Sequence, residues 1–198
     1  MTRKRAVLAV VCLALITVTA VPAWAQERMV RKEVVVNASL DEVWHAWTTN
    51  EGAETFFAPK TNIDPTVGGH YEIYFAPDNP WGFRGADDCR VQSIVPMKSL
   101  AFTWNAPPDF GVIRTLHTIV VLRFEELSPK QVKVHFTQMG WGDGEEWDKV
   151  YHYFDDAWNV VLGRLRYRFL DGPVDWSNPP CGYGNTCESG VTTLEPAS

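Results

Sequence analysis

The sequence predicts an α+β domain in which a curved antiparallel β-sheet is wrapped around one long C-terminal α-helix. Three observations support this fold class. Apolar residues recur at helical spacing between positions 144 and 170, alternation of period two recurs between 70 and 139, and a β-α-α pattern comes before both. Because an amphipathic helix and a one-sided sheet each have an apolar surface to bury, we expect them to pack on each other.

The segment 144–170 is predicted to be the helix on which the rest of the chain is organised. At about 100° per residue, its apolar side chains lie within an arc of roughly 120°. They are Trp147, Val150, Tyr151, Phe154, Trp158, Val161, Leu162, Leu165 and Phe169. Asp143 and Glu146 are expected to form a capping box at its start, and Gly172 with Pro173 should end it. Basic side chains favour the negative end of a helix, and three occur there: Arg164, Arg166 and Arg168.

Shorter elements are predicted ahead of this helix. Val30–Val36 has the composition of a strand. Ser39 with Glu42 should form the capping box of a first helix, and a second short helix is expected over 51–57. Further strands are expected at 70–75, 91–95 and 100–104, the last two joined by a short hairpin.

The two strands before the long helix, 116–127 and 131–139, have the clearest alternation. Their even positions are mostly apolar, and their odd positions are mostly polar. A turn at 128–130 sets a register in which apolar residues pair on one face and opposite charges pair on the other. The predicted pairs are Phe124 with Val134, Leu122 with Phe136, and Glu125 with Lys133.

The segment 1–25 is predicted to be a signal peptide. Positions 3–5 are basic, 6–21 are apolar, and Ala23-Trp24-Ala25 fits a small-x-small cleavage site. We therefore expect an exported protein, periplasmic or secreted, with no stable membrane anchor after cleavage. The mature part would then consist of a domain at 26–172 and an irregular tail at 173–198.

Charge and cysteine usage narrow the possible partners. The formal net charge is −6, and it becomes more negative without the basic leader, which argues against a nucleic acid or an anionic membrane as a partner. Cys181 and Cys187 bracket a small loop of the tail, where an oxidising compartment favours a disulfide. Cys89 is expected to be a small buried hydrophobe rather than a nucleophile. The oligomeric state stays open.

Four motifs occur between 30 and 170. They are Ser-Leu-Asp-Glu-Val-Trp at 39–44, Val-Gly-Gly-His-Tyr at 67–71, Val-Gln-Ser-Ile-Val-Pro-Met-Lys-Ser-Leu-Ala-Phe-Thr-Trp at 91–104 and Trp-Asn-Val-Val-Leu-Gly-Arg-Leu at 158–165. These resemble the START-like superfamily (SRPBCC, or birch-pollen-allergen-like), within it the branch named for the activator of the Hsp90 ATPase. The resemblance implies a helix-grip fold with a cavity between sheet and terminal helix, but no particular catalytic residues. That branch's name points to a cytosolic chaperone, which an exported chain would not meet.

No arrangement for metal or acid–base chemistry is visible in the sequence. The five histidines offer no pair at ligand spacing, so we expect no metal and no cofactor. Asp87 and Asp88 are adjacent and should point to opposite faces of a strand. The acidic pair at 145–146 is assigned to the first turn of the long helix, and the pair at 155–156 to its solvent-exposed side.

The remaining prediction is a ligand cavity between the inward side of the sheet and the aromatic face of the helix. A largely apolar pocket with a few polar groups is typical of small-molecule sites. The side chains expected to line it are Phe102, Trp104, Leu116, Thr118, Val120, Phe136, Gln138, Trp147, Tyr151, Phe154 and Trp158. We therefore expect the domain to bind a small hydrophobic or aromatic molecule.

Two other functions stay open. An enzyme of the same fold (a cyclase, hydrolase or isomerase) would use His70, Glu72, Tyr151 or Gln138 as polar participants. A protein-interaction module would use the loop 76–85, which carries Trp81 and Phe83, because aromatic residues are enriched at binding hot spots.

Overall fold

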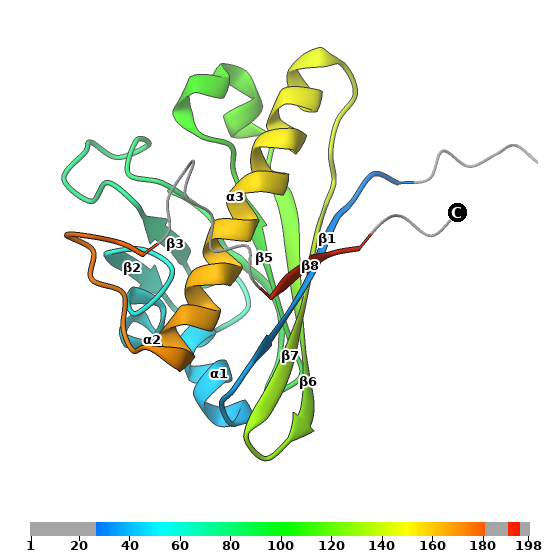
Figure 1. Cartoon of the computed structure of the whole chain (residues 1–198). Helices are drawn as coiled ribbons and strands as arrows, with labels where there is room; N and C mark the ends of the chain where they lie inside the picture. Colours follow the sequence, from blue (N-terminus) through cyan, green and yellow to red (C-terminus); the bar gives the residue numbers. More distant parts are fainter. Residues whose placement is uncertain (1–26, 181–189, 195–198) are drawn as a thin grey trace, which may run out of the picture.

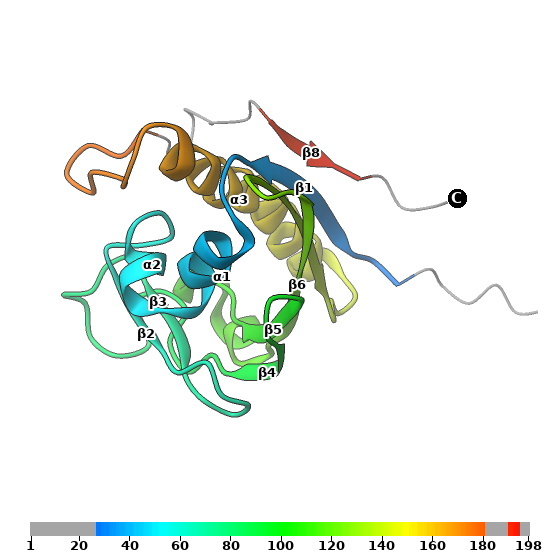
Figure 2. The same ribbon diagram turned by 90° about the horizontal axis from the view of Figure 1, so that it is seen from below.

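A computed structural model describes residues 27–180 and 190–194, so the predicted signal peptide and the Cys181–Cys187 pair lie outside the described residues. A six-stranded antiparallel sheet curves around helix α3 (Glu145–Leu170), as Figures 1 and 2 show from two directions. The α+β helix-grip class predicted from the sequence is confirmed.

The main sheet has the strand order β4-β5-β6-β7-β1-β8. Its strands are β1 (Val30–Val36), β4 (Val91–Val95), β5 (Ser99–Trp104), β6 (Thr118–Ser128), β7 (Gln131–Met139) and β8 (Val191–Thr193). The β6–β7 hairpin has the predicted register, since Phe124 pairs with Val134, Leu122 with Phe136 and Glu125 with Lys133. Alternate residues of β7 are buried, so the predicted inward face is also confirmed.

A second, two-stranded sheet lies beside the main one. It consists of β2 (Lys60–Ile63), which the sequence analysis missed because it is short and polar, and β3 (Tyr71–Tyr74). Backbone hydrogen bonds join β3 to the chain that precedes β4: Tyr71 N–H donates to the Cys89 carbonyl (2.9 Å) and Ala86 N–H to the Ile73 carbonyl (2.8 Å). Tyr71 and Ile73 are fully buried and connect this sheet to the core.

Three short helices connect the strands: α1 (Leu40–Thr48), α2 (Asn50–Glu54) and the 3₁₀ segment η1 (Pro108–Thr115). The Ser39–Glu42 capping box predicted for α1 is present. α2 begins one residue earlier than expected, because the Thr49 side chain accepts a hydrogen bond from Gly52 N–H and caps it there, and it ends earlier too, at Glu54. η1 was not predicted; Gly111 breaks it with φ 52° and ψ −122°.

Helix α3 has nearly the predicted bounds, but its start differs from the prediction. Gly144, with φ 102°, is the N-cap, and no side chain caps the helix. The expected Asp143–Glu146 capping box is therefore wrong, since Asp143 lies one residue outside the cap position. Glu145, Glu146 and Asp148 in the first turn still complement the helix dipole. Across the described ranges, no helix combines the length and apolar character needed to cross a membrane.

The chain after α3 is more ordered than expected. Val174 N–H donates to the Thr55 carbonyl (2.9 Å), and the Trp176 indole donates to the Glu54 carbonyl (2.7 Å), so this segment packs against the end of α2. Farther on, β8 pairs antiparallel with β1 at the edge of the main sheet. The expectation of a wholly irregular tail is thus wrong, because a three-residue strand is stable when an open sheet edge receives it.

Cys89 is fully buried, as predicted. Burial raises the pKa of its thiol to about 12, despite hydrogen bonds to the thiol that lower it. The thiol is therefore protonated at neutral pH, which argues against a role as a nucleophile.

An ion pair between a buried lysine and a partly exposed aspartate links α3 to β1. Lys32 is fully buried, and its Nζ lies 2.8 Å from Asp155 Oδ1 and 3.0 Å from Thr193 Oγ1. The Asp155 side chain is 36% exposed and faces this lysine, which corrects its assignment to the wet side of the helix. The contact with Thr193 adds β8 to the same cluster.

We expect Asp155→Ala to lower the free energy of unfolding by about 2–3 kcal/mol, because it leaves a buried ammonium without its counter-charge. Lys32→Met should cost clearly less, since the remaining carboxylate is partly hydrated. Urea denaturation of the two single variants measures the difference. A larger loss in Lys32→Met than in Asp155→Ala would contradict this account.

Candidate functional site

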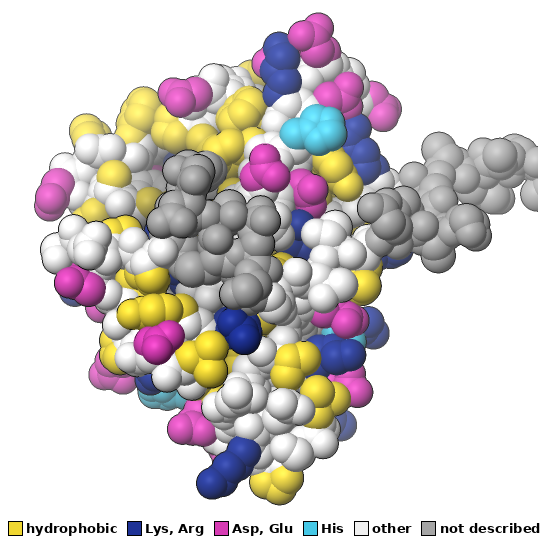
Figure 3. All heavy atoms as spheres, viewed as in Figure 1, with side chains coloured by type: hydrophobic (Ala, Val, Ile, Leu, Met, Phe, Trp, Pro, Cys, Tyr) yellow, Lys and Arg dark blue, Asp and Glu magenta, His cyan; other side chains and the backbone are white. Residues whose placement is uncertain are grey.

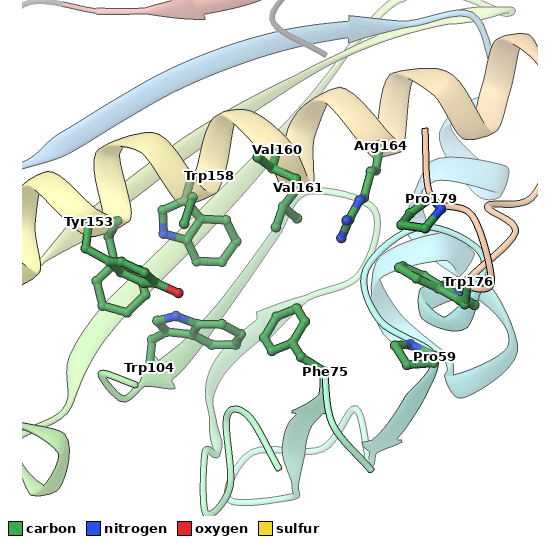
Figure 4. A pocket seen from close by; sticks show the side chains of 12 residues that line it. Pro59, Phe75, Trp104, Tyr153, Trp158, Val160, Val161, Arg164, Trp176 and Pro179 are labelled. Atoms are coloured by element: carbon green, nitrogen blue, oxygen red, sulfur yellow. The ribbon is translucent and has the colours of Figure 1, made fainter. Parts of the chain in front are cut away.

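A cavity of about 440 Å³ lies beside α3, between the helix, the end of β5 and the tail (Figure 4). Its walls are almost entirely apolar or aromatic. The described residues that line it are Pro59, Phe75, Trp104, Tyr153, Phe154, Ala157, Trp158, Val160, Val161, Arg164, Trp176 and Pro179. We call it the main cavity because of this apolar lining; a cavity of about 560 Å³ between α1 and the end of α3 is larger, but most of its lining residues are polar.

Helical spacing explains the wall that α3 contributes. The lining positions from Tyr153 to Arg164 recur at steps of three and four, which places them along one side of the helix. The opposing wall comes from two strand ends, since Trp104 is the last residue of β5 and Phe75 directly follows β3. The cavity thus occupies the place where these two strands end while α3 continues.

Closely packed aromatic rings form the inner end of the main cavity. The Trp158 ring lies 5.2 Å from that of Trp104 and 4.3 Å from that of Phe136, measured between centroids. Phe57 stacks on Trp104 at 5.7 Å and meets Trp158 edge-on at 5.8 Å. Because these rings pack against one another from several sides, the inner wall is apolar and well supported.

A chain of buried hydrogen bonds fixes the orientation of Trp158. Its indole N–H donates to Gln138 Oε1 (2.7 Å), Gln138 Nε2 donates to Thr118 Oγ1 (2.8 Å), and the Thr118 hydroxyl donates to the Trp104 carbonyl (3.0 Å). All four residues are buried. The chain therefore links α3, β7, β6 and β5 and satisfies its polar groups within an apolar core.

The other end of the main cavity is formed by Arg164 and the tail residues Trp176 and Pro179 (Figure 4). The Arg164 guanidinium carbon lies 5.3 Å from the centroid of the Trp176 ring. Figure 4 shows the Arg164 side chain extending from α3 towards the cavity. Arg164 was not predicted to line the cavity, although its position three residues after Val161 and seven after Ala157 places it on the same side of the helix and was the available signal.

A smaller cavity of about 200 Å³ adjoins the main one. The two share Phe75, Trp104, Tyr153 and Phe154, and the remaining walls of the smaller cavity come from 76–86 and 105–108. Phe83 lines it and is still 58% exposed, while Trp81 in the same loop is 68% exposed. On the face shown in Figure 3, apolar side chains gather beside the N-terminal half of α3.

The structure separates the predicted lining residues into three groups. Trp104, Phe154 and Trp158 line the main cavity. A second group is buried behind it in the core: Phe102, Thr118, Val120, Phe136 and Gln138. The third group, Leu116, Trp147 and Tyr151, lies elsewhere.

The third group corrects three expectations. Leu116 precedes β6 and is 51% exposed, because the strand begins only at Thr118 after the unpredicted η1. Trp147 packs edge-on against Trp141, with ring centroids 6.5 Å apart. The Tyr151 hydroxyl donates to the Met29 carbonyl (3.2 Å), so both aromatic residues face the start of β1 and the loop before α3 rather than the cavity.

Of the polar residues considered for catalysis, only His70 and Glu72 lie together, and neither lines the main cavity. Glu72 lies on β3, on the face opposite to the buried Tyr71 and Ile73, and His70 Nδ1 lies 3.3 Å from it. Gln138 is hydrogen-bonded to Trp158 and Thr118 in the core. Tyr151 lies near the N-terminal end of α3, where its hydroxyl donates to the Met29 carbonyl.

Glu72 is instead a structural carboxylate. Burial raises its pKa, but hydrogen bonds from the Tyr74 hydroxyl (2.7 Å), the Asp88 N–H (2.8 Å) and the Asn62 side chain (2.8 Å) outweigh this effect, and the net pKa is below its ordinary value. The charged form therefore fastens the small sheet to the chain before β4. In the parts of the chain that the structure describes, no group of three or more His, Cys, Asp or Glu side chains is placed to hold a metal ion.

We expect Gln138→Leu to lower the free energy of unfolding by about 2–4 kcal/mol, because the Trp158 N–H and the Thr118 hydroxyl both lose a buried partner. Trp158→Phe in the Gln138→Leu background should then cost less than Trp158→Phe alone. A double-mutant cycle by chemical denaturation measures this coupling. Additive costs would show that the hydrogen bond contributes nothing.

Comparison with solved structures gives the same fold in several proteins. Protein MLL2253 from Mesorhizobium loti has a TM-score of 0.58 and 22% identity, covering 73% of this chain and 97% of its own. The Aha1 dimer from Colwellia psychrerythraea has a TM-score of 0.56 and 18% identity, covering 73% and 98%. PFC0360w, an HSP90 activator from Plasmodium falciparum, has a TM-score of 0.51 and 12% identity, covering 73% and 94%. At these identities the likeness shows the fold alone.

Sequence comparison identifies the family. No curated protein matches the chain. The family model described as "Activator of Hsp90 ATPase homolog 1-like protein" matches residues 37–169, which contain both α1 and nearly all of α3. The chain therefore belongs to the family of Activator of Hsp90 ATPase homolog 1-like proteins, within the SRPBCC superfamily.

Proposed function

We propose that this domain binds a small, largely apolar or aromatic molecule in the main cavity. The observation that carries the proposal is the cavity of about 440 Å³ whose inner end is formed by Trp104, Phe154 and Trp158. This volume lies within the range of roughly 300–1,000 Å³ that is typical of small-molecule sites. The buried hydrogen-bond chain supports the proposal as well, since it holds one wall in place before any ligand arrives.

The proposal favours binding over catalysis. Apart from Arg164 and the Tyr153 hydroxyl, the described lining offers few polar groups, and it includes no carboxylate, histidine or thiol. General acid–base catalysis needs such a group within hydrogen-bond reach of the substrate. The enzyme alternative thus gains no support from the described lining.

A large side chain placed inside the main cavity should weaken the binding of an apolar probe. We expect Ala157→Trp to weaken binding of the neutral fluorophore N-phenylnaphthylamine by about tenfold or more, because a new indole occupies the space between Trp158 and Val161. Asp156→Trp is the matched control, since it adds the same ring at an exposed neighbouring position of α3. Titration followed by probe emission measures both affinities.

Equal affinities in the two variants and the unaltered protein would place the probe outside this cavity and remove the basis of the proposal. Thermal unfolding of each variant shows whether the domain is still folded during the titration. A small molecule that co-purifies with the unaltered protein, detected by native mass spectrometry, would identify the ligand class directly.

We also propose that the protein is exported. The support is the basic, apolar and small-x-small order of residues 1–25, which is the pattern of a signal peptide. In an oxidising compartment Cys181 and Cys187, which are six positions apart in the sequence, would be able to form a disulfide.

Export predicts a shortened chain outside the cytoplasm. When the full sequence is expressed in a bacterial host, the intact mass of the protein in the periplasm or medium should correspond to a start near Gln26. Ala25→Asp should block this processing, because the cleavage site requires a small residue there. A full-length mass confined to the cytoplasm would contradict the proposal.

A further inference from the structure

We propose that the cavity of about 560 Å³ between α1 and the end of α3 binds a small zwitterion, a molecule with a methylated ammonium group and a carboxylate. We call it the polar cavity. No described residue lines both this cavity and the main one, so the two sites are separate. The residues that carry the argument are charged of both signs, aromatic or apolar: Asp41, Glu42, Trp44, Met97, Arg168 and Phe169.

Two helix ends form the facing walls of the polar cavity. On α1, Asp41, Trp44 and Thr48 recur at steps of three and four, which places them along one side of the helix. Figures 1 and 2 show α1 beside the C-terminal end of α3, which contributes Arg168. The turn between β4 and β5 adds Met97.

Negative charge is held at the first turn of α1. Glu42 Oε2 accepts hydrogen bonds from the Ser39 N–H (2.9 Å) and the Ser39 hydroxyl (2.7 Å). These bonds keep the pKa of Glu42 below its ordinary value, and the charges of Arg168 and Lys130 contribute to the same effect. Asp41 is exposed, and in the described part of the chain no hydrogen bond or ion pair engages its side chain. This wall therefore offers carboxylate oxygens to an ammonium group.

Positive charge is held at the opposite wall by Arg168. Its Nε donates to Thr55 Oγ1 (2.9 Å), and the Thr55 hydroxyl donates in turn to the Gly52 carbonyl (2.6 Å). The Phe169 ring lies 5.2 Å from the guanidinium carbon. Among the described residues, no carboxylate forms an ion pair with Arg168, and its terminal NH₂ groups have no partner. These groups are the ones that bind a carboxylate through two parallel hydrogen bonds.

The helix dipoles explain why opposite charges line one cavity without pairing. Acidic side chains are favourable at the positive start of α1, and a basic side chain is favourable at the negative end of α3. Each charge is thus stabilised by its own helix, and no ion pair within the described ranges joins Arg168 to Asp41 or Glu42. A zwitterion that bridges the cavity complements both walls, whereas a ligand with one charge meets like charge at one of them.

The apolar part of the lining favours an ammonium that carries methyl groups. Trp44 is half-buried and packs edge-on against Phe124, with ring centroids 5.5 Å apart. Tryptophan is the aromatic side chain that attracts cations best, and aromatic rings recognise quaternary ammonium groups in this way. Met97 has φ 60°, in the left-handed region that a residue with a side chain rarely adopts. Strained backbone of this kind concentrates at ligand sites.

The probe that tests this inference is γ-butyrobetaine, in which three methylene groups join a trimethylammonium group to a carboxylate. Two analogues of the same shape each lack one charge: its primary amide lacks the negative charge, and the all-carbon analogue, in which carbon replaces nitrogen, lacks the positive one. We expect the unaltered protein to bind γ-butyrobetaine about fivefold or more tightly than either analogue. Titration followed by NMR measures the affinities. The Trp44 indole N–H signal should shift, and those of Trp104 and Trp158 should stay in place.

One variant at each wall assigns the two charges of the ligand. Arg168→Gln should remove the preference over the amide and keep the preference over the all-carbon analogue. Asp41→Asn should weaken the preference over the all-carbon analogue by about twofold or more and keep the preference over the amide. Because Asp41 is exposed, this variant tests the site even if Arg168→Gln fails to fold. Arg166→Gln and Asp156→Asn make the same charge changes outside the lining and should keep both preferences.

Several results would overturn the inference. They are affinities for the three compounds within about twofold of one another, no binding of γ-butyrobetaine, and shifts at Trp104 and Trp158 in place of Trp44. An equal loss of all three compounds in Arg168→Gln, or a lost preference in either control variant, would show a general effect and have the same consequence. The proposed function is tested separately, since Ala157→Trp alters the main cavity and should leave the γ-butyrobetaine affinity unchanged.

Discussion

The hydrogen bond between the Trp158 indole and Gln138 determines how the long helix sits on the sheet. Its 2.7 Å contact is the first step of a buried chain that continues through Thr118 to the carbonyl of Trp104. Apolar packing alone tolerates small rotations and shifts of a helix, whereas an unpaired buried N–H costs about 1–3 kcal/mol. The directional bond therefore selects one placement of α3. That placement holds the Trp158 ring against Trp104 and defines the inner wall of the main cavity.

The sequence predicts the fold well where two independent patterns agree. In the β6–β7 hairpin, the apolar pairing of Leu122 with Phe136 and the charge pairing of Glu125 with Lys133 require the same register, and the structure has it. The prediction that Leu116 points inward, made from its even position, is wrong. Alternation does not show where a strand begins, and η1 lies between β5 and the first residue of β6, Thr118. The capping box at Asp143 fails for a related reason, since the conformation of Gly144 moves the helix start by one residue.

The candidate site was predictable only in its aromatic part. Trp104, Phe154 and Trp158 follow from apolar periodicity, but Arg164 and Asp155 do not, because such patterns assign every charged residue of a helix to solvent. Whether a charge is exposed depends on partners far away in sequence. Asp155 faces a fully buried Lys32 on β1, and Arg164 faces Trp176 beyond the end of α3. Helical spacing places Arg164 on the lining side of α3, but local sequence does not identify the distant partner of either charge.

The tail adds to the main cavity a wall that the family model does not cover. The family model ends at residue 169, whereas Trp176 and Pro179 line the outer end of the main cavity. The matched region of this chain contains β4 to β7, nearly all of α3 and the inner tryptophans, and the segment after it supplies part of the wall near Arg164. Specificity follows from the groups that contact the polar part of a ligand, because apolar walls discriminate only weakly between apolar bodies of similar size. Under the proposed function, recognition of the polar part of a ligand therefore falls to the end of the cavity that lies partly outside the region matched by the family model.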